Sequence, residues 1–336
     1  MTAPRWEKRW HPLREEWVIV AAHRQDRPWI GDLAALPRPA AIPRHDPGCT
    51  FCPGNLRVSG VRNPDYPGVF VFDNDHPCVG KAAPSPSEAD VPFRTAPARG
   101  IARVICFDPR HDLSLAGMAP EAVRNVVLAW REEERRCVAD PDLEHVLIFE
   151  NRGEVTGVSN PHPHGQLYAT DFVMKTMADE AQAVARHHRE AGRTLLEDVV
   201  RAEEVDGRRI VYANEGAVAF VPHFARWAYE VYVVPRRPRS GVHDLTDDEA
   251  ADLADCLHRV LGSYDGLWDR PFPYVLAWHN APLRTAAPGW HAHLEIHPPL
   301  RKPDLLKYLA GPEIGGGTFL ADTVPEEKAA ELRAAL

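Results

Sequence analysis

The feature that most limits how this chain can fold is an order of sequence patterns that occurs twice. In the first half, ARVICF reads as a strand, residues 111–137 lead into an amphipathic helix, and HVLIFENRG and HPHGQLYAT read as two further strands. In the second half, YEVYVVPRR, a helical segment at 242–267, PFPYVLAWHN and WHAHLEIHPP follow in the same order. The chain is therefore predicted to contain two copies of one unit.

Residue types recur within this order as well. HDL at 111–113 returns at 243–245, an offset of 132 residues. Asn151 returns as Asn280 and His164 as His293, each at an offset of 129 residues. A nearly constant offset through strand, helix and strand indicates an internal duplication. We predict an α+β fold of two tandem units, at residues 1–175 and 176–336, each a mostly antiparallel sheet with a long helix across it.

The bulk properties exclude several classes of function. The formal net charge of the 336 residues is −9, which argues against binding to nucleic acid or to an anionic membrane. The chain has no apolar N-terminal segment and no run near the roughly 20 apolar residues of a membrane span, so a cytoplasmic protein is predicted. Six cysteines are too few for a disulfide framework and should stay reduced.

The stretch SNPHPHGQ, residues 159–166, carries the clearest chemical signal. In a strand, His162, His164 and Gln166 would share one face, and the prolines at 161 and 163 would hold the residues before them extended. A neutral imidazole is a good nucleophile toward phosphorus, so one histidine could carry a nucleotidyl group between two acceptors. The alternative is a pair of structural histidines on a loop.

The two residues after the second histidine favour transfer over hydrolysis. Gly165 would let the backbone approach a phosphate closely. Gln166 can donate its amide N–H to a phosphoryl oxygen, yet it offers no acid or base to activate water.

These motifs resemble one known family. SNPHPHGQ is similar to the active-site signature of the galactose-1-phosphate uridylyltransferases of the histidine-triad superfamily, with Gln where the hydrolase branch carries its third His. The likeness extends through KRWHPLREEWVIVAAHRQDRPW, CTFCPGNLRVSG, NPDYPGVFVFDNDHP, RVICFDPRH, FENRG, AWHNAP and LKYLAGPE. It implies tandem histidine-triad-like units with a half-barrel sheet. It also implies ping-pong transfer of a uridylyl group from UDP-glucose to a hexose 1-phosphate, galactose 1-phosphate in the family, through covalent uridylyl-His164.

The resemblance also implies roles for residues along the chain. Gln166 would steady the transferring phosphoryl group. The implied substrate contacts are Arg24 and Arg27 for phosphate, Phe51, Val58 and Phe72 for uracil, Asn74 and Asp75 for ribose, Asn151 and Ser159 near the phosphoryl group, and Lys307, Tyr308 and Glu313 for the sugar. The last three are expected to reach the site of the neighbouring subunit in a homodimer.

Two metal sites are considered. Cys49 and Cys52 form a C-x2-C pair, for which the resemblance supplies His111 and His162 as further zinc ligands. The alternative is unmetallated cysteines in a turn.

In the second half, alternation would place His291, His293, Glu295 and His297 on one strand face. The resemblance implies a second zinc or iron there, held by Glu180, His279, His293 and Glu295. The alternative is a solvated His/Glu face.

The acceptor sugar is the least determined part of the prediction. Pro312, His76 and either Phe319 or Leu320 stand where family members carry other residue types. Three hypotheses follow: a UDP-glucose:hexose-1-phosphate uridylyltransferase, a related nucleotidyltransferase or phosphorylase acting on another nucleotide sugar or dinucleotide, and a metal-stabilised nucleotide-binding module without turnover.

Overall fold

A nine-stranded sheet dominates the fold. The computed structural model describes residues 6–26, 42–87, 92–268 and 270–336. The strand order is β3-β4-β6-β5-β10-β11-β9-β8-β7, and all neighbours in it are antiparallel. The strands are β3 (Phe70–Asp73), β4 (Gly100–Cys106), β5 (His145–Arg152), β6 (His164–Thr170), β7 (Ile210–Ala213), β8 (Ala217–Phe220), β9 (Val231–Pro235), β10 (Tyr274–His279) and β11 (His293–His297).

Two small sheets and the helices complete the described chain. The small sheets are β1 (Trp6–His11), β2 (Glu16–Ala21) and β14 (Leu320–Ala321), and the pair β12 (Leu300–Lys302) and β13 (Leu305–Leu306). The α-helices are α1 (Pro120–Val138), α2 (Lys175–Ala191), α3 (Leu195–Asp206), α4 (Asp247–Leu267) and α5 (Pro325–Ala334). Short helical turns are η1 (Ala22–Asp26), η2 (Leu115–Gly117), η3 (Glu154–Thr156), η4 (Val242–Asp244) and η5 (Gly311–Gly315).

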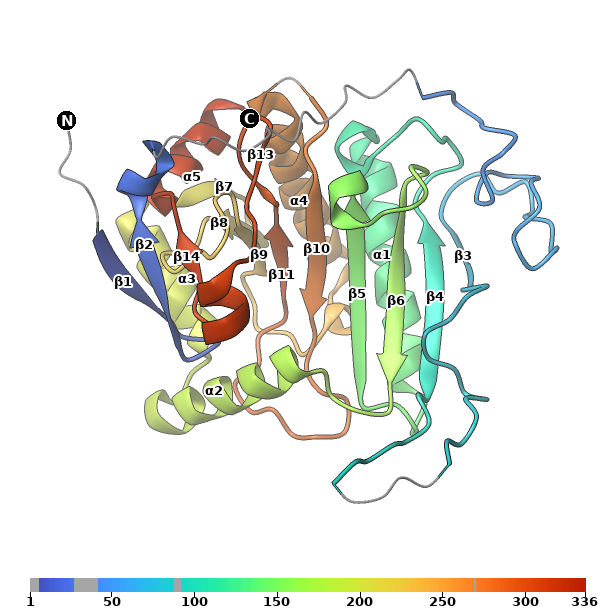
Figure 1. Ribbon diagram of the computed structural model, residues 1–336, viewed down its shortest axis with the longest axis horizontal. Helices are drawn as coiled ribbons and strands as arrows, with labels where there is room; N and C mark the ends of the chain where they lie inside the picture. Colours follow the sequence, from blue (N-terminus) through green and yellow to red (C-terminus); the bar gives the residue numbers. More distant parts are fainter. Residues whose placement is uncertain (1–5, 27–41, 88–91, 269) are drawn as a thin grey trace.

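The internal duplication is visible in the order of the strands. Outward from the central pair β5 and β10, the sheet has β6 and β11, then β4 and β9, then β3 and β8. The two halves join where Tyr274 lies opposite Arg152 and Ala277 opposite Phe149. Figure 1 shows α1 and α4, which contact each other, on the same side of this sheet. The predicted α+β fold with a mostly antiparallel sheet is confirmed, and the sheet is open.

The two long helices form for local reasons and bury one side. In α1, Pro120 occupies the first turn, where a missing N–H costs little. Val123, Val127 and Trp130 recur at helical spacing and are fully buried against the sheet. In α4, Thr246 caps the helix by accepting a hydrogen bond from the backbone N–H of Glu249. This packing leaves the opposite sheet face for polar side chains.

Two strands begin later than predicted, β6 by two residues and β11 by three. Strand β6 begins at His164 rather than at His162, because prolines have no N–H to pair with a neighbouring strand. The backbone N–H of His162 donates instead to Asn160 Oδ1 at 3.0 Å. Likewise, β11 begins at His293, and the ring of His291 turns away so that its Nε2 donates to the carbonyl of Pro235 at 2.7 Å.

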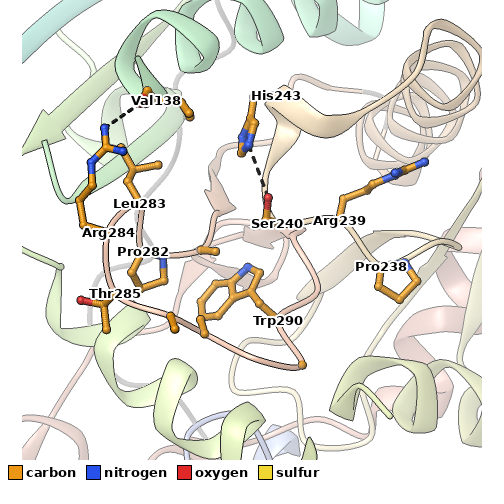
Figure 2. A pocket seen from close by; sticks show the side chains of 14 residues that line it. Val138, Pro238, Arg239, Ser240, His243, Pro282, Leu283, Arg284, Thr285 and Trp290 are labelled. Atoms are coloured by element: carbon orange, nitrogen blue, oxygen red, sulfur yellow. Dashed lines mark hydrogen bonds between the residues drawn. The ribbon is translucent and has the colours of Figure 1, made fainter. Parts of the chain in front are cut away.

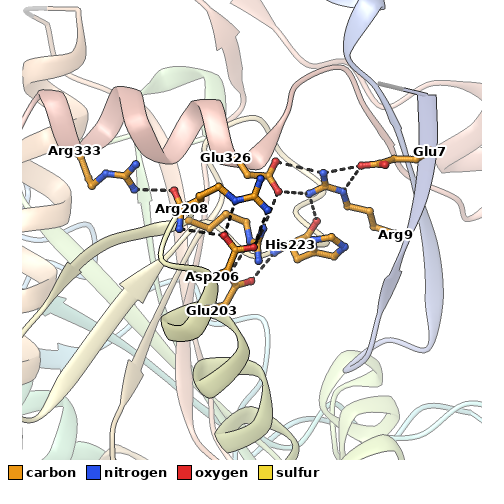
Figure 3. A network of polar contacts seen from close by, with 9 residues as sticks. Glu7, Arg9, Glu203, Asp206, Arg208, His223, Glu326 and Arg333 are labelled. Atoms are coloured by element: carbon orange, nitrogen blue, oxygen red, sulfur yellow. Dashed lines mark hydrogen bonds and ion pairs between the residues drawn. The ribbon is translucent and has the colours of Figure 1, made fainter. Parts of the chain in front are cut away.

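A polar network fixes the hairpin of β1 and β2 to the second half of the chain. Arg9 on β1 donates to Glu326 on α5 at 3.1 Å, and Arg209 donates to the same carboxylate at 2.8 Å (Figure 3). Arg209 also donates to Glu203 on α3 at 2.6 Å. Because Arg9, Arg209 and Glu203 are all buried, this network holds the hairpin in one position. The turn of that hairpin carries Arg14 toward the sheet.

Candidate active site and metal-binding clusters

The geometry around His164 leaves one ring nitrogen available for chemistry. His164 Nδ1 lies 2.7 Å from the carbonyl oxygen of His162, and a carbonyl can only accept, so Nδ1 carries the proton. The lone pair is then on Nε2. Burial lowers the pKa of His164 below its ordinary value, which favours the neutral ring. The ring of Phe51 lies 4.9 Å away, centroid to centroid.

Gln166 lies on the same face of β6 and is oriented by its neighbour. The hydroxyl of Tyr168 donates to Gln166 Oε1 at 3.0 Å, which leaves the amide Nε2 of Gln166 free to donate. Strand β5 lies alongside, with Phe149 opposite Gln166. Asn151 continues the same alternation on β5 toward the His164 end of β6.

Close packing requires a glycine at position 165. A Cβ on Gly165 would lie 2.9 Å from both the Phe107 ring and the carbonyl oxygen of Phe149. Strand β6 therefore packs too tightly against the core at this point for any larger residue.

We expect Gln166→Glu to slow the nucleotidyl transfer predicted for His164 by roughly 10² to 10³, the loss typical when one donor to a developing oxyanion is removed. The new carboxylate would repel the phosphoryl oxygens instead of donating to them. Single-turnover formation of the predicted nucleotidyl-His164 adduct measures the effect. Tyr168→Phe, which removes only the orienting hydroxyl, is the matched control and should cost far less; equal losses in both variants would contradict the role of Gln166.

The implied uracil and ribose residues gather beside this strand. The rings of Phe51 and Phe72 lie 5.7 Å apart, and Asp75 accepts from the backbone N–H of Ser59 at 3.2 Å. Val58, next to Ser59, has 63% of its surface exposed. Asn74 Oδ1 accepts from the N–H of His76 at 2.9 Å. Ser159 is exposed on the loop before β6.

Sequence reasoning missed Arg57 and Tyr66 in this region. The guanidinium of Arg57 lies 4.4 Å from the Phe72 ring centroid and 3.7 Å from Asp75. Its position one residue before Val58 in the motif CTFCPGNLRVSG was the available signal. Tyr66 lies within the motif NPDYPG, and its hydroxyl donates to the carbonyl of Phe51 at 2.7 Å.

The four residues of the first metal cluster come together behind His164. Cys49, Cys52, His111 and His162 are all buried, and their ligand atoms lie within 4.8 Å of one another. Cys52 Sγ is 3.6 Å from Nδ1 of both histidines. Since the Tyr66 hydroxyl already donates to Phe51, it accepts from His162 Nε2 at 3.0 Å. The Nδ1 lone pair of His162 therefore faces the cysteines.

The four residues of the second cluster also come together, on the far half of the sheet. Glu180 on α2, His279 on β10, and His293 and Glu295 on β11 are fully buried. Glu295 belongs in addition to a trio with Glu230 and His297, which was not predicted. His291, which does not enter either group, bonds to Pro235 as described above. Both clusters gather buried side chains of the types that bind metal ions, with their ligand atoms within 4.8 Å of one another.

The implied sugar and phosphate residues fall into a separate group. Arg24 donates to Asp322 at 3.1 Å, and Lys307 donates to Glu313 at 3.2 Å. Lys307 also lies near the rings of Trp227 and Phe319. These residues lie beside the small sheet of β1, β2 and β14, on the left in Figure 1, whereas β3 and β6 are on the right. Tyr308 is half-exposed in the same segment, and Arg27 lies outside the described residues.

The two duplicate units differ in the region that surrounds a cavity of about 460 Å³, lined mainly by residues of the second half (Figure 2). It is lined by the loop between β10 and β11, the counterpart of the loop that precedes His164, and Trp290 lies across it. His243, the counterpart of His111, lies 3.3 Å from Glu134 and not beside cysteines. His293 keeps the backbone contact of His164, donating from Nδ1 to the carbonyl of His291 at 3.0 Å, but it is 1% exposed. The counterpart of His164 in this half is therefore buried.

The chain has two tandem histidine-triad-like units, and one of them presents a histidine with a free Nε2 beside an amide donor. This combination defines a nucleotidyltransferase. This chain belongs to the galactose-1-phosphate uridylyltransferase family. The models of the N-terminal and C-terminal domains of galactose-1-phosphate uridyl transferase match residues 3–174 and 179–336.

Individual relatives agree with this assignment. The chain is 37% identical to the galactose-1-phosphate uridylyltransferase of Rattus norvegicus, over 97% of this chain and 86% of the relative. It is 35% identical to that of Haemophilus influenzae, over 97% and 93%. A solved uridylyltransferase structure is 32% identical with a TM-score of 0.80, covering 98% of both chains. An ADP-glucose phosphorylase from Arabidopsis thaliana, 22% identical with a TM-score of 0.78, shares the fold over 98% of this chain and 99% of its own.

Nothing in the described helices suggests insertion into a bilayer. Across residues 6–26, 42–87, 92–268 and 270–336, no helix combines the length and the apolar character needed to span a membrane.

Proposed function

We propose that this protein transfers a uridylyl group from UDP-glucose to a hexose 1-phosphate, galactose 1-phosphate by its family, through covalent uridylyl-His164. The observation that carries the proposal is the pair of contacts that leaves His164 Nε2 unprotonated and Gln166 Nε2 free to donate. Nε2 attacks the α-phosphorus, the P–N bond forms, and the P–O bond to glucose 1-phosphate breaks. A phosphate oxygen of the acceptor then attacks the same phosphorus, and the P–N bond breaks.

Mass spectrometry after incubation with a nucleotide sugar tests this function. UDP-glucose without acceptor should give a UMP adduct on His164, which galactose 1-phosphate then removes as UDP-galactose. An adduct of AMP from ADP-glucose instead would favour a related nucleotidyltransferase or phosphorylase. No adduct with either donor would contradict catalysis through His164. Several hexose 1-phosphates should be tested as acceptors. The reason is that the apolar ring of Phe319 lies 5.8 Å from the Lys307 ammonium in the implied sugar segment.

For the first cluster we propose a zinc ion held by Cys49, Cys52, His111 and His162. Bond lengths of about 2.3 Å to sulfur and 2.0–2.1 Å to nitrogen give a tetrahedral S···N edge of about 3.6 Å. That value agrees with the two Cys52–histidine separations of 3.6 Å. The hydrogen bond from His162 Nε2 to Tyr66 would fix the ring that zinc requires. Zinc would join the loop at 42–66 to the segment before His164, and its contribution would be structural.

We propose further that the protein is a homodimer whose sites combine residues of both subunits, and that each chain divides at about residue 175 into its two units. Arg24, Lys307 and Glu313 belong to segments beside the small sheet of β2 and β14, which lies apart from β6 in Figure 1 and supports a site completed by a partner. Apolar side chains are exposed beside both groups: Leu56, Val58 and Val61 near the first, and Tyr308, Leu309 and Ile314 near the second. Exposed apolar surface of this kind is typical of interfaces.

Complementation between two inactive variants tests the shared site. Co-expressed His164→Gly and Arg24→Ala chains should recover activity, about a quarter of the wild-type value, because each heterodimer rebuilds one complete site. Steady-state UDP-galactose formation measures the recovery. His164→Gly mixed with Gln166→Glu is the control and should stay inactive, since both changes fall in the same half-site. If the first mixture recovers nothing while heterodimers form, the shared site is wrong.

A further inference from the structure

The second His/Glu cluster is built around one carboxylate that is already surrounded by nitrogen donors. Glu295 Oε2 lies 3.0 Å from His297 Nε2 and 3.2 Å from a terminal nitrogen of Arg14. It also lies 3.5 Å from His279 Nε2 and 3.6 Å from Arg226. The Glu295 side chain has no exposed surface. Four nitrogen groups from separate parts of the chain therefore converge on a single buried oxygen.

Arg14 reaches both carboxylates that a metal at this cluster would need. Its Nε lies 3.2 Å from Glu180 Oε1, and its terminal nitrogen 3.2 Å from Glu295 Oε2. The side chain is 12% exposed and comes from the turn between β1 and β2, where the backbone N–H of Arg14 donates to His11 Nδ1 at 3.3 Å. The neighbouring Leu13 is buried at 1% exposure. The turn is thus packed in place, and it inserts the guanidinium between α2 and β11.

These contacts do not suit a divalent ion. A zinc or iron bound to Glu180 Oε1 and Glu295 Oε2 would lie about 2.0–2.2 Å from them. These are the two oxygens that the Arg14 guanidinium already contacts, each at 3.2 Å. Arginine keeps its charge in proteins, so it cannot relieve the repulsion by losing a proton. His279 is also engaged on both ring nitrogens, with Nδ1 2.9 Å from Glu180 and Nε2 3.5 Å from Glu295.

We propose that the guanidinium of Arg14 is the resident cation of this cluster and excludes a divalent metal from it. In this role Arg14 replaces a structural metal ion. It joins the β1–β2 turn, α2 and β11 through the two buried carboxylates of Glu180 and Glu295. Arg226 adds a second positive charge on the same side. The protein consequently holds a single metal ion per chain, at the cluster of Cys49, and the second metal implied by the family resemblance is not part of it.

Removal of the Arg14 guanidinium would leave metal-ligand atoms of the cluster without a cation. His293 donates from Nδ1 to a backbone carbonyl, so Nε2 is the ring nitrogen that faces Glu295, at 3.5 Å from Oε1. Neither His293 Nε2 nor Glu295 Oε1 has a hydrogen-bond partner among the described residues. With Arg14 shortened to an uncharged side chain, Glu180, His293 and Glu295 would offer three ligands to a cation.

Metal counting on the full-length protein, as purified and after exchange with Co²⁺, tests the proposal. The wild type should contain one equivalent of metal, with the thiolate-to-cobalt absorption of a cysteine site. Glu295→Gln should leave that count unchanged. Arg14→Met should take up a second equivalent without added thiolate absorption, whereas Arg14→Lys, which keeps the charge, should not.

Arg186→Met is the matched control, because Arg186 is an exposed arginine paired with Glu15 beside the same turn. It should bind the same amount of cobalt as the wild type. A wild type with two equivalents, one of which Glu295→Gln removes, would overturn the proposal, and so would a folded Arg14→Met protein that binds one. If Arg14→Met does not fold, the wild-type count and its response to Glu295→Gln still decide. None of these readouts depends on uridylyl transfer.

Discussion

His164→Gly abolishes uridylyl transfer, with an expected loss on the order of 10⁵ or more, as for the removal of other covalent nucleophiles. The side chain that would form the P–N bond is gone, and no other described histidine on β6 can replace it. The ring is partly buried beside Phe51, so the change leaves a cavity that free imidazole can enter. Added imidazole should restore part of the activity. Single-turnover exchange between UDP-glucose and labelled glucose 1-phosphate measures both effects.

The same assay on His258→Ala gives the matched control, because His258 is a half-exposed histidine on α4, on the other side of the sheet. It should keep nearly full activity. The His164→Gly protein should also keep its metal and its thermal transition, since His164 is not a ligand of the Cys49 cluster. Transfer at the wild-type rate by folded His164→Gly would refute covalent catalysis through this residue.

Cys52→Ser is expected to remove the zinc proposed for the first cluster and to lower the free energy of unfolding by an amount on the order of 5 kcal/mol. Cys52 is the residue whose sulfur touches both histidines, and it is completely buried. Without the metal, the loop at 42–66 loses its attachment to His162, and Phe51 is no longer held beside His164. Metal analysis and thermal unfolding should therefore report the loss together with falling activity.

Cys137→Ser is the control for Cys52→Ser. It measures the stability lost by burying a hydroxyl group alone, without loss of a metal. Cys137 is 3% exposed on α1 and lies in the main hydrophobic core, away from both clusters. This variant should lose about 1–3 kcal/mol of stability and keep its full metal content. If Cys52→Ser behaves in the same way and retains its metal, the zinc assignment is wrong.

The repeated unit was predictable because it depends on local patterns. Alternation and helical periodicity set β4, α1, β5 and their counterparts, and a constant offset links the two copies. At the starts of β6 and β11, alternation of residue types continues past the point where backbone pairing stops. Before β6, Pro163 has no N–H to offer. Before β11, the N–H of Ala292 donates instead to the carbonyl of Arg239.

The gathering of Cys49, Cys52, His111 and His162 was expected only through resemblance. Spacing within a motif identifies Cys49 and Cys52 as a pair, but no local rule names two histidines that are 59 and 110 residues from Cys52. The position of Arg14 in the second cluster could not be predicted from the sequence. It is 281 residues from Glu295, and its part in the second cluster depends on a buried turn and on the arginine network that holds β1.

The sequence by itself determined the duplicated α+β unit, the histidine and amide side chains that share one face of β6, and the family. These follow from residue types at short, regular spacings, where the backbone geometry of strands and helices decides which side chains share a face. Only the tertiary structure decided that Arg24 and Lys307 lie apart from His164 and that a guanidinium occupies the second cluster. Those arrangements depend on how distant segments pack, because burial brings charges together without regard to their separation along the chain.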